Sequence, residues 1–171
     1  PSLFHDPDGT KWLVNMLFDY RLDHKRFGGV GVQQYDPETK KLVGPVYNVF
    51  KGSDKGTTEG PNIFYHDGWY YLVTAEGGTE FKHCVTMCRS EKLTGPYEIS
   101  PYVPVLTSFG KDVQLKRAGH GQIIQGKDGN WYMAHLCSRS LGDCSITGRE
   151  TAIQNMLYTD DGWFKLSAND T

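Results

Sequence analysis

Long hydrophobic runs and a strong excess of one charge are both missing from this sequence. Its apolar runs are only a handful of residues long, whereas a membrane-spanning helix needs about 20. Lys and Arg number 18 against 20 Asp and Glu, which gives a net charge of −2 and therefore no basic field to attract nucleic acid. We therefore expect no membrane-spanning segment and no nucleic-acid partner.

Cysteine is also scarce. The four residues of this type are Cys84, Cys88, Cys137 and Cys144, and their spacings match no common zinc motif. We expect free, partly buried thiols, with a disulfide or a metal site as the alternatives. This usage suits a reducing compartment such as the cytoplasm.

Apolar residues at helical spacing are nearly absent, and short β-prone segments take their place. Aromatic residues make up 13% of the chain, and 20 residues are glycine. Three segments share one pattern, in which a short apolar strand, an Asp-Gly turn and an aromatic-rich strand follow one another. The segments are PSLFHDPDGTKWLVNM from Pro1, GPNIFYHDGWYYLVTA from Gly60 and GHGQIIQGKDGNWYMAHL from Gly119, so that the pattern recurs about every 60 residues.

A second pair of strands follows each hairpin, so the predicted repeating unit has four antiparallel strands. A repeat of this kind is typical of a propeller blade, and the fold class is all-β. The blade-like units span about residues 1–56, 57–116 and 117–171. Because a closed propeller takes about 4 to 8 blades, three blades predict an incomplete ring with open sheet edges. A β-sandwich would also contain short alternating strands, but it explains the regular repeat poorly.

The start of each blade is where we expect a site, because the innermost strand of a propeller blade lines the central channel. Aligning the repeats on their turns places Glu59 and His120 at equivalent positions, so both are expected to face one axis. A buried carboxylate can act as a general acid, but hydrolysis of a glycosidic bond normally needs a second carboxylate. The sequence shows none at an equivalent position. The alternative for Glu59 is a solvated turn residue.

Two further candidates are an arginine and an aromatic residue. In GRETAIQ, residues 148–154, strand geometry places Arg149 and Glu150 on opposite faces. The guanidinium of Arg149 is suited to bind sugar hydroxyls or a carboxylate through its fork of donors, and the alternative is a surface pair with Glu150. Inner-strand aromatic residues such as Phe18 are suited to stack on sugar rings, although most aromatic residues are expected in the core.

Taken together, four segments resemble glycoside hydrolase family 43, especially its β-xylosidase and α-L-arabinofuranosidase members. The segments are PSLFHDPDGTKWLVNMLFDYR, TTEGPNIFYHDGWYYLVTAEGG, AGHGQIIQGKDGNWYMAHL and GRETAIQ, and the likeness runs over essentially the whole chain. The resemblance implies a five-bladed β-propeller, of which this chain holds about three four-stranded blades, corresponding to blades two or three through five.

The resemblance also implies roles for individual residues. Members of the family invert the anomeric centre with an Asp base, a second Asp that tunes the acid and orients the substrate, and a Glu acid. Glu59 matches the acid of the family's EGP motif, and Arg149 matches the substrate-contacting arginine of its GRET motif. His120 matches a histidine on the propeller axis that is associated with a bound calcium ion or a water network. Phe18 lies where relatives often carry an aromatic residue lining the sugar pocket. No cofactor is required, and a calcium ion near the axis is the one expected candidate.

Both catalytic Asp residues fall outside this chain under the resemblance: the base lies in a blade absent here, and the second Asp directly precedes Pro1. We therefore expect the chain to be the C-terminal part of an inverting glycoside hydrolase that acts on oligosaccharides derived from xylan and arabinoxylan. We expect it to be inactive alone, and its partner to be the missing N-terminal segment or a second chain. The alternatives are a non-catalytic carbohydrate-binding propeller and a protein-interaction propeller.

Overall fold

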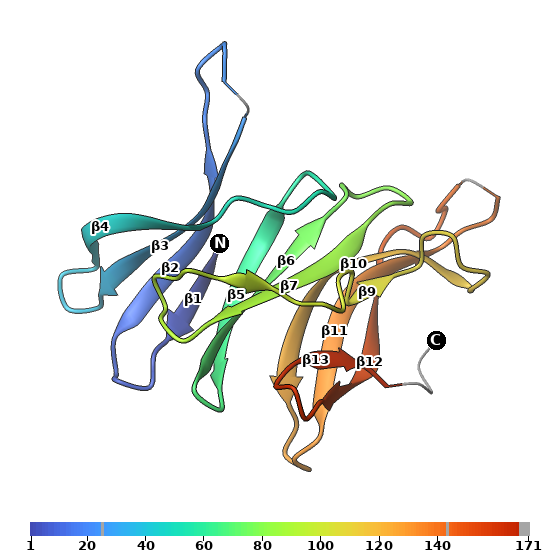
Figure 1. The fold of residues 1–171 in the computed structure, drawn as a ribbon. Helices are drawn as coiled ribbons and strands as arrows, with labels where there is room; N and C mark the ends of the chain where they lie inside the picture. Colours follow the sequence, from blue (N-terminus) through green and yellow to red (C-terminus); the bar gives the residue numbers. More distant parts are fainter. Residues whose placement is uncertain (25, 143, 168–171) are drawn as a thin grey trace.

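The computed structural model describes residues 1–24, 26–142 and 144–167. This part of the chain forms 13 β-strands and no helix, so it also contains no helix that could cross a membrane. The strands form three antiparallel sheets that follow one another along the chain and lie side by side (Figure 1). The predicted all-β class is confirmed, and the curled sheets are blades of a partial β-propeller.

The first sheet has four strands in the order β1-β2-β3-β4. Its strands are β1 (Ser2–His5), β2 (Lys11–Phe18), β3 (Phe27–Asp36) and β4 (Lys41–Phe50). Each strand pairs with the next in antiparallel fashion, as expected for successive hairpins.

The second sheet repeats this meander and carries one extra strand. Its main path is β5 (Glu59–His66), β6 (Trp69–Glu76), β7 (Cys84–Ser90) and β8 (Glu98–Ile99), and β9 (Leu106–Thr107) also pairs with β7. The sequence pattern did not predict β9, because two residues are too few to show an alternation of apolar and polar side chains.

The third sheet again has four strands. They are β10 (Leu115–Gln125), β11 (Trp131–Arg139), β12 (Glu150–Tyr158) and β13 (Phe164–Leu166), in that order. β10 begins earlier than the sequence suggested, and register shifts interrupt its pairing with β11 on both sides of Gly119.

The Asp-Gly turns form as predicted, but they differ in length. In the second sheet Asp67 and Gly68 form a two-residue loop in which both have positive φ, 49° and 83°, the geometry that favours Asp-Gly at this place. The third hairpin is one residue longer between equivalent strand pairs. This difference affects the alignment of the repeats, because an alignment on the turns shifts the strands by one residue.

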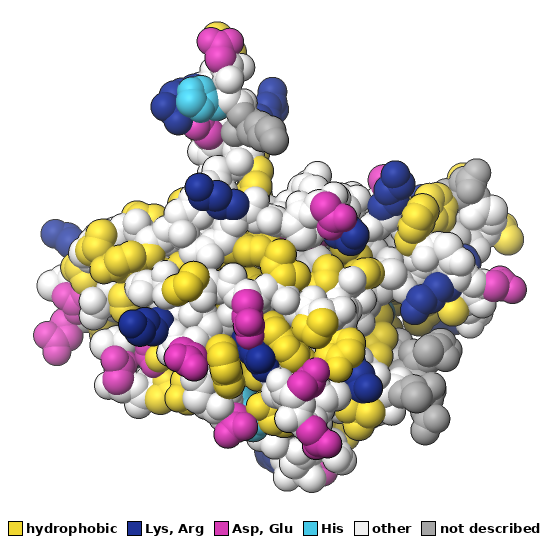
Figure 2. Space-filling view, viewed as in Figure 1, with side chains coloured by type: hydrophobic (Ala, Val, Ile, Leu, Met, Phe, Trp, Pro, Cys, Tyr) yellow, Lys and Arg dark blue, Asp and Glu magenta, His cyan; other side chains and the backbone are white. Residues whose placement is uncertain are grey.

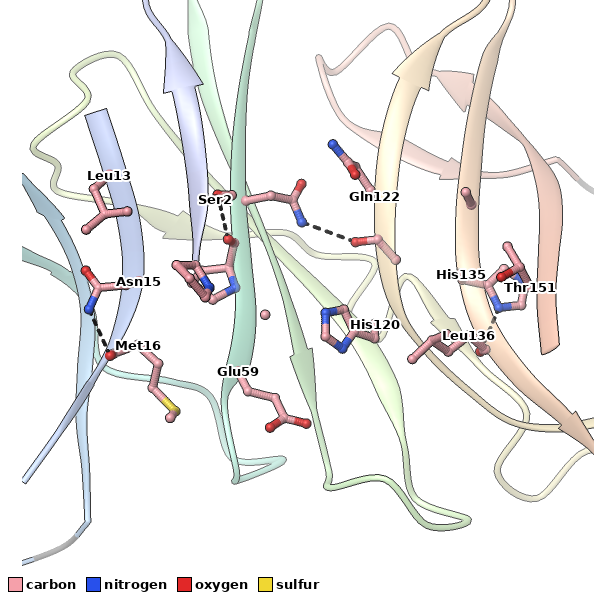
Figure 3. A pocket seen from close by; sticks show the side chains of 16 residues that line it. Ser2, Leu13, Asn15, Met16, Glu59, His120, Gln122, His135, Leu136 and Thr151 are labelled. Carbon is pink, nitrogen blue, oxygen red and sulfur yellow. Dashed lines mark hydrogen bonds between the residues drawn. The ribbon is translucent and has the colours of Figure 1, made fainter. Parts of the chain in front are cut away.

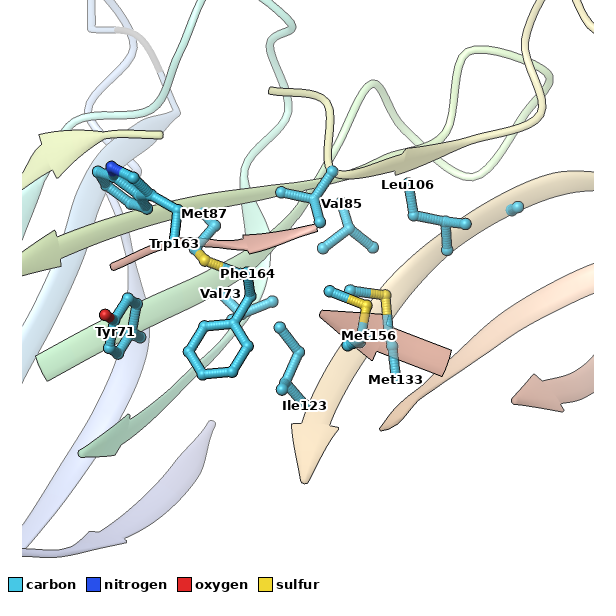
Figure 4. Close-up of a cluster of buried hydrophobic side chains, with 12 residues drawn as sticks. Tyr71, Val73, Val85, Met87, Leu106, Ile123, Met133, Met156, Trp163 and Phe164 are labelled. Carbon is cyan, nitrogen blue, oxygen red and sulfur yellow. The ribbon is translucent and has the colours of Figure 1, made fainter. Parts of the chain in front are cut away.

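Two hydrophobic cores hold the three sheets together. The core between the second and third sheets contains Tyr71, Met87, Met133 and Phe164 among others (Figure 4). Tyr71 and Phe164 are fully buried and their rings meet edge to face at 5.1 Å, and the Tyr71 hydroxyl donates to the Gly162 carbonyl at 2.6 Å. Burying each such side chain stabilises the fold by about 1.5–3 kcal/mol. This core fixes the third sheet against the second.

The core between the first and second sheets is built mainly from aliphatic residues. Val14, Val30 and Val32 of the first sheet and Leu72 of the second are completely buried in it. β-Branched side chains pack well on a pleated surface. The two cores together set the spacing of the innermost strands β1, β5 and β10.

The outward faces of the first and third sheets expose apolar side chains. Figure 2 shows hydrophobic side chains at the surface over β4, where Val46 is 51% exposed. On the third sheet Ile124, Ile153 and Leu157 share one face by strand register, and all three are exposed. Both faces therefore lack an apolar covering within the described residues.

All four cysteines lie in the described part of the chain and are free. Cys84, Cys88 and Cys137 are buried, whereas Cys144 is exposed. Burial raises the pKa of the Cys84 thiol to about 11, with the nearby Glu76 as a second cause. The prediction of free thiols is confirmed, and the buried ones act as small apolar side chains.

Candidate active site

Glu59 opens β5 immediately before a β-bulge. Glu59 pairs with Ala75 and Asn62 pairs with Val73, so three steps on β5 face two on β6. The extra residue leaves the ladder and turns the strand locally. This bulge determines how the first residues of the innermost strand face the centre of the molecule.

The same bulge recurs in β10, and it corrects the predicted equivalence of Glu59 and His120. Gly119 pairs with Leu136 and Gln122 with Ala134, which matches the pattern in β5 one sheet earlier. His120 therefore corresponds to Gly60, and both have positive φ, 51° and 55°. The prediction was wrong by one residue because it aligned the turns, and the third hairpin is longer.

His120 and Gly60 are nevertheless in direct contact across the two sheets. A Cβ atom on Gly60 would overlap the His120 ring at Nε2 and Cε1. Glycine is thus required at position 60 both for its φ and for the space it leaves. The imidazole is held beside Glu59 by this close approach.

Glu59 and His120 line one cleft of about 950 Å³ at the innermost strands (Figure 3). The cleft is also lined by Pro1 and Ser2 of β1 and by residues of β2, β11 and β12. Glu59 is the one carboxylate among the described residues that line it, and no hydrogen bond or ion pair engages Glu59 within that part of the chain. A half-buried carboxylate without a partner is free to exchange a proton with a ligand.

Hydrogen bonds between sheets hold the innermost strands in place around the cleft. The Ser2 hydroxyl donates to the Pro61 carbonyl at 2.8 Å, and the Asn62 amide donates to the Gly121 carbonyl at 3.3 Å. Each bond joins one blade to the next at the level of the bulges (Figure 3). The cleft wall is therefore continuous across all three sheets.

Arg149 lies in a neighbouring cavity and not among the residues that line the main cleft. This cavity of about 240 Å³ is lined by His83, Arg117 and Ser138 as well as Arg149. Arg149 is exposed and directly precedes β12. Its guanidinium faces a polar site that adjoins, without sharing, the wall formed by Glu59 and His120.

His83 connects the two cavities, and the sequence patterns did not single it out. It is 3% exposed, its Nδ1 lies 3.1 Å from the Arg117 carbonyl, and its ring packs so closely on Gly119 that a Cβ there would overlap it. The charges of His120, Glu59 and Arg149 all act on it. A buried histidine between two strands of polar neighbours has no distinctive local spacing, so only the fold reveals it.

Phe18 lies at the end of β2, away from the cleft-lining residues. It is 40% exposed, and its ring centroid is 4.7 Å from that of Tyr20. The two rings form an exposed aromatic pair at the base of the β2–β3 hairpin. Whether Phe18 contacts a sugar stays a prediction.

A calcium ion near the axis also stays a prediction. Ca²⁺ takes about 6 to 8 oxygen ligands, whereas His120 has one carboxylate, that of Glu59, beside it in the described cleft. No group of three or more His, Cys, Asp or Glu suited to a metal occurs in the parts of the chain that the structure describes. The residues present therefore do not by themselves fit such an ion.

We expect the buried histidines to make stability fall as the pH is lowered. Burial lowers the pKa of His83 and of His135 below the usual 6.5, and the bond from each ring to a backbone carbonyl opposes this only partly. Below about pH 6.5 the unfolded chain binds protons that the folded chain refuses, so the free energy of unfolding decreases by at most about 1.4 kcal/mol per pH unit for each histidine.

Urea unfolding of the full-length protein between about pH 7.5 and about pH 5.5 measures this effect. The variants His83→Gln and His135→Gln should each reduce the dependence on pH. His5→Gln, at an exposed position of β1, is the control. Equal pH dependence in all three variants would contradict the assignment.

Comparison with known proteins places this geometry in a family. The model of "Glycosyl hydrolases family 43" matches residues 1–164. The chain is 48% identical over 168 residues to xylosidase/arabinosidase 43B of Humicola insolens, covering 95% of this chain and 31% of that protein. It is 45% identical to a xylan 1,3-beta-xylosidase of a Vibrio species, covering 94% of this chain and 33% of the relative.

A solved structure agrees with these relatives. The crystal structure of xylan beta-1,4-xylosidase from Bacillus halodurans C-125 superimposes with a TM-score of 0.95 and is 49% identical, covering 100% of this chain and 33% of that one. The chain thus spans about a third of the length of these relatives. The predicted resemblance is confirmed, and the chain belongs to glycosyl hydrolase family 43.

Proposed function

We propose that the protein containing this chain is an inverting β-xylosidase or α-L-arabinofuranosidase with Glu59 as its general acid. One observation carries the proposal: Glu59 is the one carboxylate among the described residues of the cleft, and it stands without a partner beside His120. Xylosidase and arabinosidase names among the relatives support the substrate class, oligosaccharides from xylan or arabinoxylan.

In the proposed mechanism Glu59 donates a proton to the glycosidic oxygen as the bond to the sugar breaks. Water attacks the anomeric carbon from the opposite face and gives its proton to an Asp base that this chain does not contain. Inverting enzymes hold the two carboxyl groups roughly 6.5–9.5 Å apart, which leaves room for the water. A second Asp directly before Pro1, as the family resemblance implies, would adjoin the cleft because Pro1 lines it.

The other candidate residues have supporting roles in this proposal. His120, held against Gly60, shapes the floor of the cleft beside the acid. Arg149 binds substrate hydroxyls from the adjoining cavity through its fork of donors. Phe18, with Tyr20, offers an aromatic surface to a sugar ring at the edge of the site.

The missing part of the ring completes the molecule in this proposal. The apolar face with Ile124, Ile153 and Leu157, and the one over β4, are suited to pack against further blades from the same protein or a second chain. Such packing would bring the Asp base to the cleft and remove the exposed apolar surface.

The test follows the anomeric configuration of the product by NMR, using the full-length protein with xylobiose and an arabinofuranosyl oligosaccharide. We expect the first product formed from one of them to have the inverted configuration. The 171-residue chain in the same assay should give no product, since loss of the base removes a contribution of about 10²–10⁴-fold. Retained configuration, or native-like turnover by the chain alone, would contradict the mechanism.

A non-catalytic carbohydrate-binding propeller is the second candidate. It is favoured by the single carboxylate of the described cleft, since hydrolysis normally needs two. Calorimetry that detects binding of xylobiose to the full-length protein, together with no turnover of either sugar, would support this candidate over the enzyme.

A further inference from the structure

Glu76 is a completely buried carboxylate at the end of β6. It is 0% exposed, and no Lys or Arg of the described residues forms an ion pair with it. Its printed partners are neutral donors: the Ser53 amide at 2.9 Å and the Thr58 hydroxyl at 2.6 Å on Oε1, and the Ser53 hydroxyl on Oε2. Burying a charge is costly unless hydrogen bonds compensate for the lost water, so this arrangement has a strong reason to persist.

These donors all belong to the segment that joins β4 to Glu59. The segment has irregular backbone, with positive φ at Gly52, Gly56 and Thr57. A positive φ is unfavourable for a β-branched residue such as Thr57. The Gly77 amide donates to the Gly56 carbonyl at 2.7 Å, next to Glu76. The end of β6 thus holds a strained segment that would otherwise be free to relax.

Thr58 is the link between this anchor and the acid. It is 1% exposed and directly precedes Glu59. Its surroundings leave little freedom, because a Cβ on Gly52 would lie 2.6 Å from Thr58 Oγ1 and 3.6 Å from Glu76 Oε1. With the Thr58 hydroxyl fixed, the backbone that carries Glu59 is fixed as well.

We propose that Glu76 and Thr58 are positioning residues that hold the general acid Glu59 in its orientation toward the cleft. The inference rests on the proposed function, in which Glu59 protonates the leaving group. Neither residue lines the cleft, so each acts through the backbone before β5. A misplacement of about 1 Å in a catalytic group can cost about 100-fold in rate.

The central test replaces Thr58 by valine, which has the same shape and lacks only the hydroxyl. Thr58→Ser keeps the hydroxyl and serves as the rescue variant. Thr86→Val is the matched control, because Thr86 is also 1% exposed and shares a 2.5 Å hydroxyl contact with Thr74 in the same sheet. If Thr58→Val does not give folded protein, Thr58→Ala removes the same hydroxyl with less bulk.

The readout is the ratio of kcat on xylobiose to kcat on 2,4-dinitrophenyl β-xyloside, measured on the full-length protein; the corresponding arabinosides replace them if arabinofuranose is the preferred sugar. Thr58→Val should lower kcat on the disaccharide by about 10- to 100-fold. It should change kcat on the activated substrate by less than about threefold, since its leaving group needs little protonation. Thr58→Ser should restore the ratio. Thr86→Val should keep it, because a purely structural loss lowers both rates equally.

Substitution of Glu76 tests the other end of the link. In Glu76→Gln the amide oxygen can accept from the Ser53 amide and the Thr58 hydroxyl, while the amide nitrogen donates to the Ser53 hydroxyl. This variant should keep the ratio of rates, whereas Glu76→Leu should lower it as Thr58→Val does.

The variant Glu59→Gln separates failure of this inference from failure of the proposed function. If Glu59→Gln lowers the ratio but Thr58→Val and Glu76→Leu leave it at the Thr86→Val value, the positioning role is overturned and Glu59 remains the acid. If Glu59→Gln also leaves the ratio unchanged, the role of Glu59 itself is overturned.

Discussion

Replacing Glu59 by glutamine in the full-length protein should lower kcat on xylobiose by about 10²–10⁴-fold. Glutamine keeps the size of the side chain and a hydrogen-bond donor, but it cannot transfer a proton to the leaving oxygen. On an activated aryl xyloside the rate should fall much less, because that leaving group departs without a proton. The contrast between the two substrates identifies the acid more directly than a loss of activity alone.

Steady-state kinetics on both substrates measure this contrast. The matched control is Glu91→Gln, which changes an exposed carboxylate that does not line the cleft. An unchanged rate on xylobiose would remove Glu59 from the mechanism. Equal losses on both substrates would instead show that the substitution disturbs binding or folding.

The hairpins and blades could be predicted from the sequence because their signals are local. Asp67-Gly68 and the alternating segments around it specify a hairpin through backbone preferences that act within a few residues. The repetition of this pattern then gave the number of sheets. Burial between sheets, as for Phe164, follows from the alternation of side chains along each strand.

The register at the site could not be predicted in the same way. The bulge that aligns His120 with Gly60 depends on an extra residue in the ladder, and no residue type marks its place in the sequence. The longer third hairpin moved the turn without moving the bulge. An alignment of the inner strands on their apolar residues Ile63 and Ile123, in place of the turns, would have given the correct register.

Residues that act through tertiary contacts were missed for a related reason. Glu76 ends an otherwise apolar strand, and a charged residue at a strand end usually faces water. Its burial depends on donors more than 15 residues away in the chain, as with Thr58. Separation in sequence also explains why Arg149 was expected at the main cleft, whereas the structure lines an adjoining cavity with it.

Substituting alanine for Gly60 should lower the free energy of unfolding of the full-length protein by about 2–5 kcal/mol. About 1–2 kcal/mol comes from placing an L-residue at a φ of 55°. A further 1–3 kcal/mol, roughly, comes from overlap between the new Cβ and the His120 ring. Displacement of that ring beside the acid should also reduce activity by more than about tenfold.

Gly68→Ala is the matched control, because Gly68 has a φ of 83° but open space around it. It should show the backbone cost alone, and equal losses for Gly60→Ala and Gly68→Ala would contradict the predicted overlap. The double-mutant cycle with His120→Ala isolates the contact itself. Once the imidazole is removed, Gly60→Ala should cost no more than Gly68→Ala does. The difference between the two backgrounds then measures how strongly the bulge of β5 holds His120 next to Glu59.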